Sequence, residues 1–114
     1  MHITPQACAA VYDMLRHFKP FSGWKLPEAD AVEFRVKAYK GHFAEVNHYV
    51  RTDERIMSIS SVKHKTLDEL TQTIAHEMCH IRQYQLKQNI GHGKAFKRMA
   101  RSICKEFGWN ERAF

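Results

Sequence analysis

The segment His76-Glu77-Met78-Cys79-His80 combines two imidazoles and a carboxylate at a spacing that suits metal chemistry. In a helix, residues four apart lie on the same face, about 6 Å apart along the axis. His76 and His80 can therefore direct two ring nitrogens at one ion. Glu77 is rotated by about 100° from His76, so it is a poor third ligand but can reach a water molecule on the metal. These donors suit a zinc ion that activates water.

A third ligand is predicted within the run Gly91-His92-Gly93. If the helix stops about six residues beyond His80, the chain has moved about 9 Å along the axis. The residues that follow can span about 20 Å, which is enough to fold back, and glycines permit sharp backbone angles. His92 is therefore the candidate ligand. The alternatives are a solvated loop histidine and, as a replacement ligand, the carboxylate of Glu106.

The other histidines and the cysteines are predicted to have simpler roles. His42 and His48 lie on one face of a predicted strand, where a second metal site is a weaker alternative and His48 is a polar group near the cleft. Cys8, Cys79 and Cys104 are odd in number and form no Cys-x-x-Cys pair, which argues against a disulfide framework and a zinc ribbon. We expect each cysteine to be a small buried apolar residue.

The bulk properties are those of one small globular domain. The chain has 114 residues, with 44% hydrophobic and 26% charged residues. It contains no apolar run near the ~20 residues that span a bilayer, and residues 1–6 do not resemble a signal peptide. We therefore expect a cytoplasmic monomer with no membrane partner. The net charge of +6 makes nucleic acid a candidate partner.

The first third of the chain is predicted to form one helix, and the next part a sheet. Residues 4–19 are typical of an amphipathic helix, because an apolar stripe recurs at helical spacing: Val11, Leu15 and Phe18. Alternation of apolar and polar residues predicts strands at 31–39, 42–50 and 55–60. A tight turn at Lys40-Gly41 would join the first two strands. An antiparallel meander with the third strand at an edge is the simplest arrangement.

Two helices are predicted after the sheet. Thr66 and Glu69 form a capping box at the start of the first helix, which ends between residues 84 and 88. Its apolar stripe is Leu67, Leu70, Ile74, Met78 and Ile81, and the two histidines lie well round from that stripe. Residues 94–107 form the last helix, which ends at Gly108. Its basic residues are Lys94, Lys97, Arg98, Arg101 and Lys105.

Two motifs together resemble a known family, the SprT-like metallopeptidases, which include the Spartan proteases that act on DNA–protein crosslinks. The motifs are His76-Glu77-Met78-Cys79-His80 and Gly91-His92-Gly93-Lys94-Ala95-Phe96, and Gln83 also fits. The resemblance covers residues 30–108. It implies a zincin helix followed by a segment whose histidine completes the zinc site. Many members add a C-terminal zinc ribbon, for which this chain has no cysteine pair.

The sequence thus predicts an α+β, zincin-like minimal metallopeptidase domain over residues 1–114. Its elements are an N-terminal helix, a three-stranded mainly antiparallel sheet, the motif helix and a C-terminal helix. His76, His80 and His92 would hold Zn²⁺, and Glu77 would be the general base in the hydrolysis of peptide bonds, with DNA-associated proteins as candidate substrates. Tyr84 and His48 are weak candidates for a second oxyanion donor.

Three other functions remain compatible with these residues. The first is a zinc-stabilised nucleic-acid-binding module with little or no catalysis. The second is a hydrolase of non-peptide amides, and the third is a structural helical domain without zinc.

Overall fold

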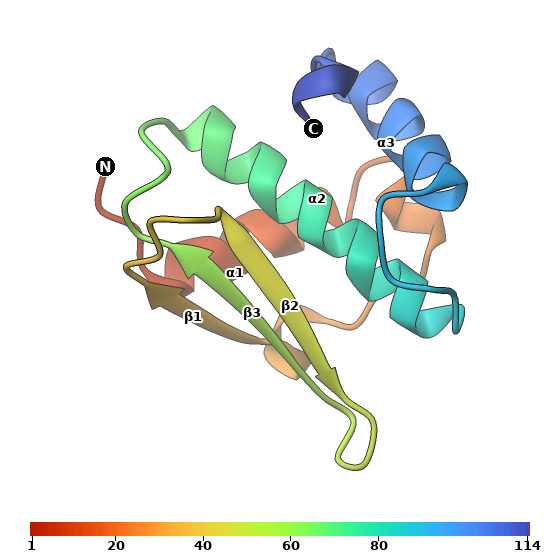
Figure 1. The fold of residues 1–114 in the computed structure, drawn as a ribbon, viewed down its shortest axis with the longest axis horizontal. Coiled ribbons are helices and arrows are strands. Elements are labelled where there is room, and N and C mark those ends of the chain that lie inside the picture. Colours follow the sequence, from red (N-terminus) through yellow and green to blue (C-terminus); the bar gives the residue numbers. More distant parts are fainter.

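Three helices and one three-stranded sheet make up the protein, in a computed structural model that describes residues 1–114 (Figure 1). The helices are α1 (Pro5–Leu15), α2 (Leu67–Gln85) and α3 (Lys94–Phe107). The strands are β1 (Glu33–Lys37), β2 (Ala44–Tyr49) and β3 (Glu54–Ser60). The arrangement is of the predicted α+β class. None of the helices combines the length and apolar character needed to cross a bilayer.

The sheet is mixed, with the strand order β1-β3-β2. β2 pairs antiparallel with β3, whereas β1 pairs parallel with β3. The predicted antiparallel meander with the third strand at an edge is therefore wrong. Lys40-Gly41 is not a tight turn but part of a longer connection between β1 and β2. This connection leaves a gap of one strand between them, and β3 occupies it. β3 buries Ile56, Met57 and Ile59, and this apolar character favours the central position.

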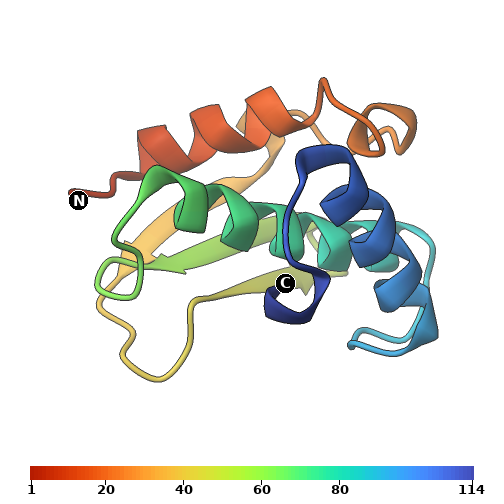
Figure 2. The ribbon, with the colours of Figure 1, turned by 90° about the horizontal axis from the view of Figure 1, so that it is seen from above.

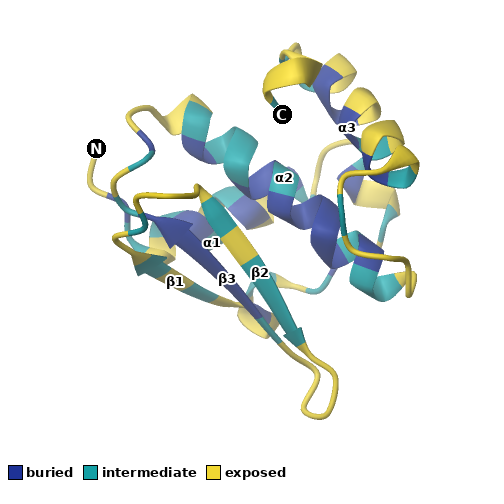
Figure 3. Ribbon diagram, in the orientation of Figure 1, coloured by how far each residue is buried: buried dark blue, intermediate teal, exposed yellow.

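Helices α1 and α2 cover one face of the sheet. Phe34, Met57 and Val46 lie side by side in register on the three strands. Met57 belongs to the same hydrophobic cluster as the apolar residues of both helices, and Phe34 and Val46 pack against that cluster. Helix α1 contacts β1, helix α2 contacts β2, and the two helices contact each other (Figure 2). Burial is accordingly deepest along β3 and the inner side of α2 (Figure 3).

Helix α1 ends at Leu15 and is therefore shorter than the predicted helix over residues 4–19. Residues 16–19 form turns instead, in which the N–H groups of His17 and Phe18 bond to the main-chain oxygens of Met14 and Leu15. Phe18, which was expected in the apolar stripe, is 48% exposed. Tyr12 takes its place in the core and is fully buried, and its hydroxyl donates to the main-chain oxygen of Pro27 at 2.6 Å.

Helix α2 has the predicted apolar side. Its fully buried residues there are Leu70, Ile74, Met78 and Ile81. Leu67 is the exception at 61% exposure, because it is the first residue of the helix and precedes the part that reaches the core. One half of the capping box is confirmed, since the Thr66 hydroxyl accepts from the main-chain N–H of Glu69 at 3.1 Å. The Glu69 carboxylate reaches back to the Thr66 hydroxyl at 3.3 Å rather than to the main-chain N–H of Thr66.

The end of α2 is closed by a lysine rather than by the glycines. Lys87 has a positive φ of 55°, whereas neither Gly91 nor Gly93 has a positive φ. The N–H groups of Lys87 and Gln88 bond back to carbonyls of the last helical turn, which is the Schellman arrangement. The chain does bend at Gly91, His92 and Gly93 as predicted, but neither glycine adopts the left-handed conformation.

We expect Lys87→Gly to stabilise the protein by about 1 kcal/mol. A left-handed conformation costs a residue with a Cβ about 1–2 kcal/mol, and the greater conformational entropy of glycine in the unfolded chain offsets part of this gain. Denaturant-induced unfolding measures the change. Gln88→Gly is the matched control. Gln88 has no positive φ, so this substitution should destabilise. A Lys87→Gly protein that is no more stable than the Gln88→Gly protein would contradict the assignment of strain.

Helix α3 and the cysteines agree with the sequence predictions. Helix α3 covers the predicted residues and ends at Gly108, which has a φ of 73°. Cys8, Cys79 and Cys104 are all free and buried. Burial raises the pKa of the Cys8 thiol to about 11, so this cysteine is a packing residue rather than a reactive thiolate.

Candidate metal centre

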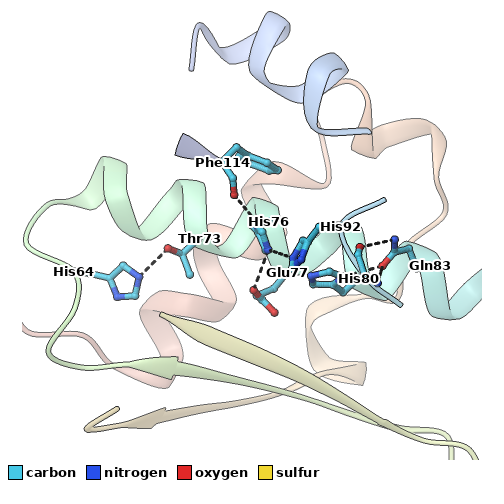
Figure 4. Close-up of polar contacts among 9 residues, drawn as sticks. His64, Thr73, His76, Glu77, His80, Gln83, His92 and Phe114 are labelled. Carbon is cyan, nitrogen blue, oxygen red and sulfur yellow. Dashed lines mark hydrogen bonds and ion pairs between the residues drawn. The ribbon is translucent and has the colours of Figure 1, made fainter. Parts of the chain in front are cut away.

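Three imidazole rings converge beside the outer side of α2. Ring nitrogens of His76, His80 and His92 all lie within 4.8 Å of one another. Two of the rings come from α2, and the third comes from the loop between α2 and α3 (Figure 4). The Nε2 atoms of His76 and His92 are 3.1 Å apart. Two nitrogens on a tetrahedral zinc ion lie about 3.4 Å apart, so the cluster fits a shared ion.

Hydrogen bonds orient the two histidines of α2. Nδ1 of His76 donates to the main-chain oxygen of Phe114 at 2.5 Å, and Nδ1 of His80 donates to Oε1 of Gln83 at 2.8 Å. Because these oxygens can only accept, each ring carries its proton on Nδ1 and presents the lone pair of Nε2 to the cluster. Metal-binding histidines usually donate their second N–H in this way.

The ring of Phe96 forms an apolar floor under the cluster. Its centroid lies 5.2 Å from that of His80, 4.7 Å from that of His92 and 4.8 Å from that of His76. Phe96 is 5% exposed and belongs to α3. A hydrophobic shell of this kind limits solvent access to a metal. Helix α3 therefore helps to build the site as well as to extend the core.

Burial keeps the two helix histidines uncharged near neutral pH. Desolvation lowers the pKa of His76 to about 4, against the opposing effect of its hydrogen bond to Phe114. Burial also lowers the pKa of His80. Neutral imidazole is the form that binds a metal ion, so these residues are held in the state that a ligand requires.

Glu77 lies beside the cluster rather than in it. Its Oε2 atom is 3.9 Å from Nε2 of His76, and its side chain is 8% exposed. Burial raises its pKa to about 7, and the negative charge of Glu45 adds to the effect. A cation bound to the three histidines would favour the carboxylate again. The position suits a base that acts on a water molecule held near the cluster.

Two cavities border His76. The smaller, of about 400 Å³, is lined by Phe43, Ala44, Glu69, Gln72, Thr73, His76, Glu77, Ala113 and Phe114. The larger, of about 750 Å³, is lined by His76, His92, Phe96, Lys97, Ala100, Asn110, Glu111, Arg112 and Phe114. His76 and Phe114 line both cavities, whereas Glu77 lines only the smaller one. The smaller cavity therefore brings the carboxylate of Glu77 and one histidine of the cluster, His76, to one space that a ligand can enter.

A comparison with models of protein families tests which family the chain belongs to. The model of the SprT-like family matches residues 11–113. The chain belongs to the SprT-like family. Searches of curated proteins and of solved structures gave no significant match.

The other candidate residues of this SprT-like chain lie outside the cluster. Glu106 is exposed on α3, and neither His42 nor His48 joins a group that could hold a metal ion. His48 instead lies 2.8 Å from a carboxylate oxygen of Asp53, and its ring packs edge-on against Tyr84 at 5.2 Å. Neither His48 nor Tyr84 lines a cavity that contains His76. They gain no support as oxyanion donors.

The SprT-like site includes a pair that the sequence did not reveal. His64 is buried, and its Nδ1 donates to the main-chain oxygen of Ser60 at 3.0 Å. Its Nε2 must therefore accept the hydroxyl proton of Thr73, which lies 2.8 Å away. Thr73 lines the smaller cavity one turn before Glu77. With its proton donated to His64, its hydroxyl can act toward any further group only as an acceptor. No local pattern predicts this pair, because its two residues lie nine positions apart, one before α2 and one within it.

Proposed function

We propose that this SprT-like chain is a zincin-like zinc metalloendopeptidase, with His76, His80 and His92 as the metal ligands and Glu77 as the general base. The supporting observation is the combination of three converging imidazoles with a carboxylate 3.9 Å from one of them, beside a cavity. Three neutral nitrogen donors are the ligand set of a catalytic zinc ion that keeps a position open for water.

The chain's own residues account for the proton transfers. A zinc ion held by the three histidines supplies a Lewis acid that acidifies water and polarises a carbonyl oxygen. Glu77 takes the proton of the attacking water and passes it to the leaving nitrogen of the peptide. The Glu77 side chain is buried, which limits its contact with bulk water during this transfer.

The substrate is proposed to lie along β2. The third strand, predicted from the sequence to lie at an edge, is central and has no free edge to pair with an extended substrate. β2 is an edge strand, and its first residue, Ala44, lines the smaller cavity together with Phe43 and Glu77. An extended peptide paired with this edge would pass the carboxylate.

Metal analysis combined with protein digestion tests the function. We expect the purified chain to bind one zinc ion and to digest casein or a DNA-binding protein, and to lose both properties together on treatment with a chelator. Digestion with and without single-stranded DNA shows whether DNA activates the enzyme. A zinc-free protein, or a zinc-loaded protein that cleaves no peptide bond, would contradict the proposal. Activity on small amides alone would favour the non-peptide alternative.

A nucleic-acid-binding role has separate support from α3. Four cationic residues recur at helical spacing along one exposed stripe of this helix: Lys94, Arg98, Arg101 and Lys105. Of these, Arg101 forms an ion pair with Glu111 at 3.5 Å. The unpaired charges suit contacts with phosphates. DNA is therefore a proposed partner, either as a binding site beside the peptidase or as the main ligand of a zinc-stabilised module.

Replacing Arg98 and Lys105 together by Glu tests the basic stripe. We expect the double substitution to weaken binding to single-stranded DNA and to reduce the slope of log K against log salt by about 1.4, since each phosphate contact on a single strand contributes about 0.7. The control replaces Lys37 and Lys40 by Glu in the same way. Lys37 is exposed on β1, and Lys40 is exposed just after it. An equal loss of DNA affinity in both proteins would show that only the net charge of the protein matters for binding.

A further inference from the structure

The amide of Gln83 lies between the second histidine and the loop that carries the third. Gln83 is 2% exposed. Its Oε1 accepts from Nδ1 of His80 at 2.8 Å and from the N–H of Gly91 at 3.4 Å, and its Nε2 donates to the main-chain oxygen of Gly91 at 3.0 Å (Figure 4). Its own main-chain oxygen accepts from Gln88 at 3.0 Å. Gln83 thus bonds to the loop at two points.

The rest of this loop has few other attachments. Residues 86–90 are exposed, and so is His92. Residues 89–92 form no hydrogen bond from main chain to main chain. The two bonds between Gln83 and Gly91 therefore hold the segment directly before His92. Without them, only the ring contacts of His92 would keep it near the cluster.

We propose that Gln83 is a positioning residue that assembles the three-histidine cluster before a metal binds, an inference that rests on the proposed metal site. One side of its amide sets the tautomer of His80, so that Nε2 presents a lone pair. The other side fixes Gly91 and with it the position of His92. The same side chain thus orients one ligand and anchors the backbone of another.

Only a side chain with both an acceptor and a donor can make these contacts. Leucine has a similar size and can remain buried, but it offers neither. Gln83→Leu would free His80 to adopt the opposite tautomer and would release the loop before His92. Metal binding to the variant would then have to order both groups. The affinity of the variant for the metal ion should therefore fall, even though all three ligands are present.

Metal affinity of Gln83→Leu tests the proposal. We expect its affinity for Zn²⁺, measured by competition with a chelating indicator, to fall 10–100-fold. The visible spectrum of its Co²⁺ form should lose intensity typical of four-coordinate binding. Gln85→Leu is the matched control. Gln85 lies on the same helix, and its amide bonds to the main-chain oxygen of Lys25, so Zn²⁺ affinity should change less than threefold.

A folded Gln83→Leu protein with the wild-type affinity and spectrum would overturn the proposal. If Gln83→Leu does not fold, NMR of the metal-free wild-type protein decides instead. The expected result is His80 with its proton on Nδ1 and backbone order parameters near 0.85 at Gly91 and His92. A proton on Nε2, or order parameters below 0.6, would overturn it. A wild-type chain that binds no Zn²⁺ refutes the proposed function, whereas these metal-free measurements test Gln83 alone.

Discussion

Glu77→Gln is expected to lower kcat/KM for a protein substrate by 10²–10⁴-fold, the usual contribution of a general base, while the chain still binds zinc. Glutamine has nearly the same shape as glutamate but cannot take a proton from water. Glu77 is buried, and its carboxylate lies 3.9 Å from His76 without joining the cluster. The substitution therefore removes the base and leaves the three ring nitrogens in place.

Zinc content and digestion rate have to be measured on the same sample. Glu106→Gln is the matched control, because Glu106 is an exposed carboxylate on α3, and it should retain both zinc and activity. Zinc-loaded Glu77→Gln protein that cleaves at the normal rate would remove Glu77 from this role. Loss of zinc along with activity would instead assign Glu77 to metal binding.

His92→Ala is expected to remove most of the stabilisation of the protein by zinc. At a free Zn²⁺ concentration 100 times the dissociation constant, binding stabilises the wild-type fold by about 2.7 kcal/mol. Loss of one of three ligands should cost at least the ~100-fold in affinity that a supporting residue can cost. At the same Zn²⁺ concentration, the variant should then gain at most about 0.4 kcal/mol. Denaturant unfolding with and without Zn²⁺ measures both values.

The metal-free stability of His92→Ala should match that of the wild type, because His92 is exposed and lies in a loop. His17→Ala is the control for loss of an exposed histidine, and it should keep the full zinc effect. An equal zinc effect in His92→Ala and the wild type would show that the ion binds elsewhere. Activity of the variant should fall with its zinc content.

The grouping of the site residues could be predicted because it depends on local geometry. His76 and His80 are four residues apart, so any helix there brings them together. His92 required only a loop long enough to fold back, and the structure does place its ring 5.0 Å from that of His80. Their role as ligands stays a prediction that the experiments above address.

The strand order and the supporting contacts depend on long-range packing, which periodicity does not encode. Alternation located the strands but could not show that β3 lies between β1 and β2. The hydrogen bond from His76 to Phe114 joins residues 38 positions apart, and nothing local predicts it. Lys87 adopts a left-handed conformation for which glycine would be expected, and no local sequence pattern predicts it.

A crystal structure of the zinc-soaked protein, with anomalous diffraction at the zinc edge, is the most direct measurement of the central claim. The expected result is one strong peak within bonding distance of Nε2 of His76, His80 and His92, with Glu77 beside it and not bound. A peak elsewhere, or a His92 ring turned away from the other two with no peak between them, would contradict the account.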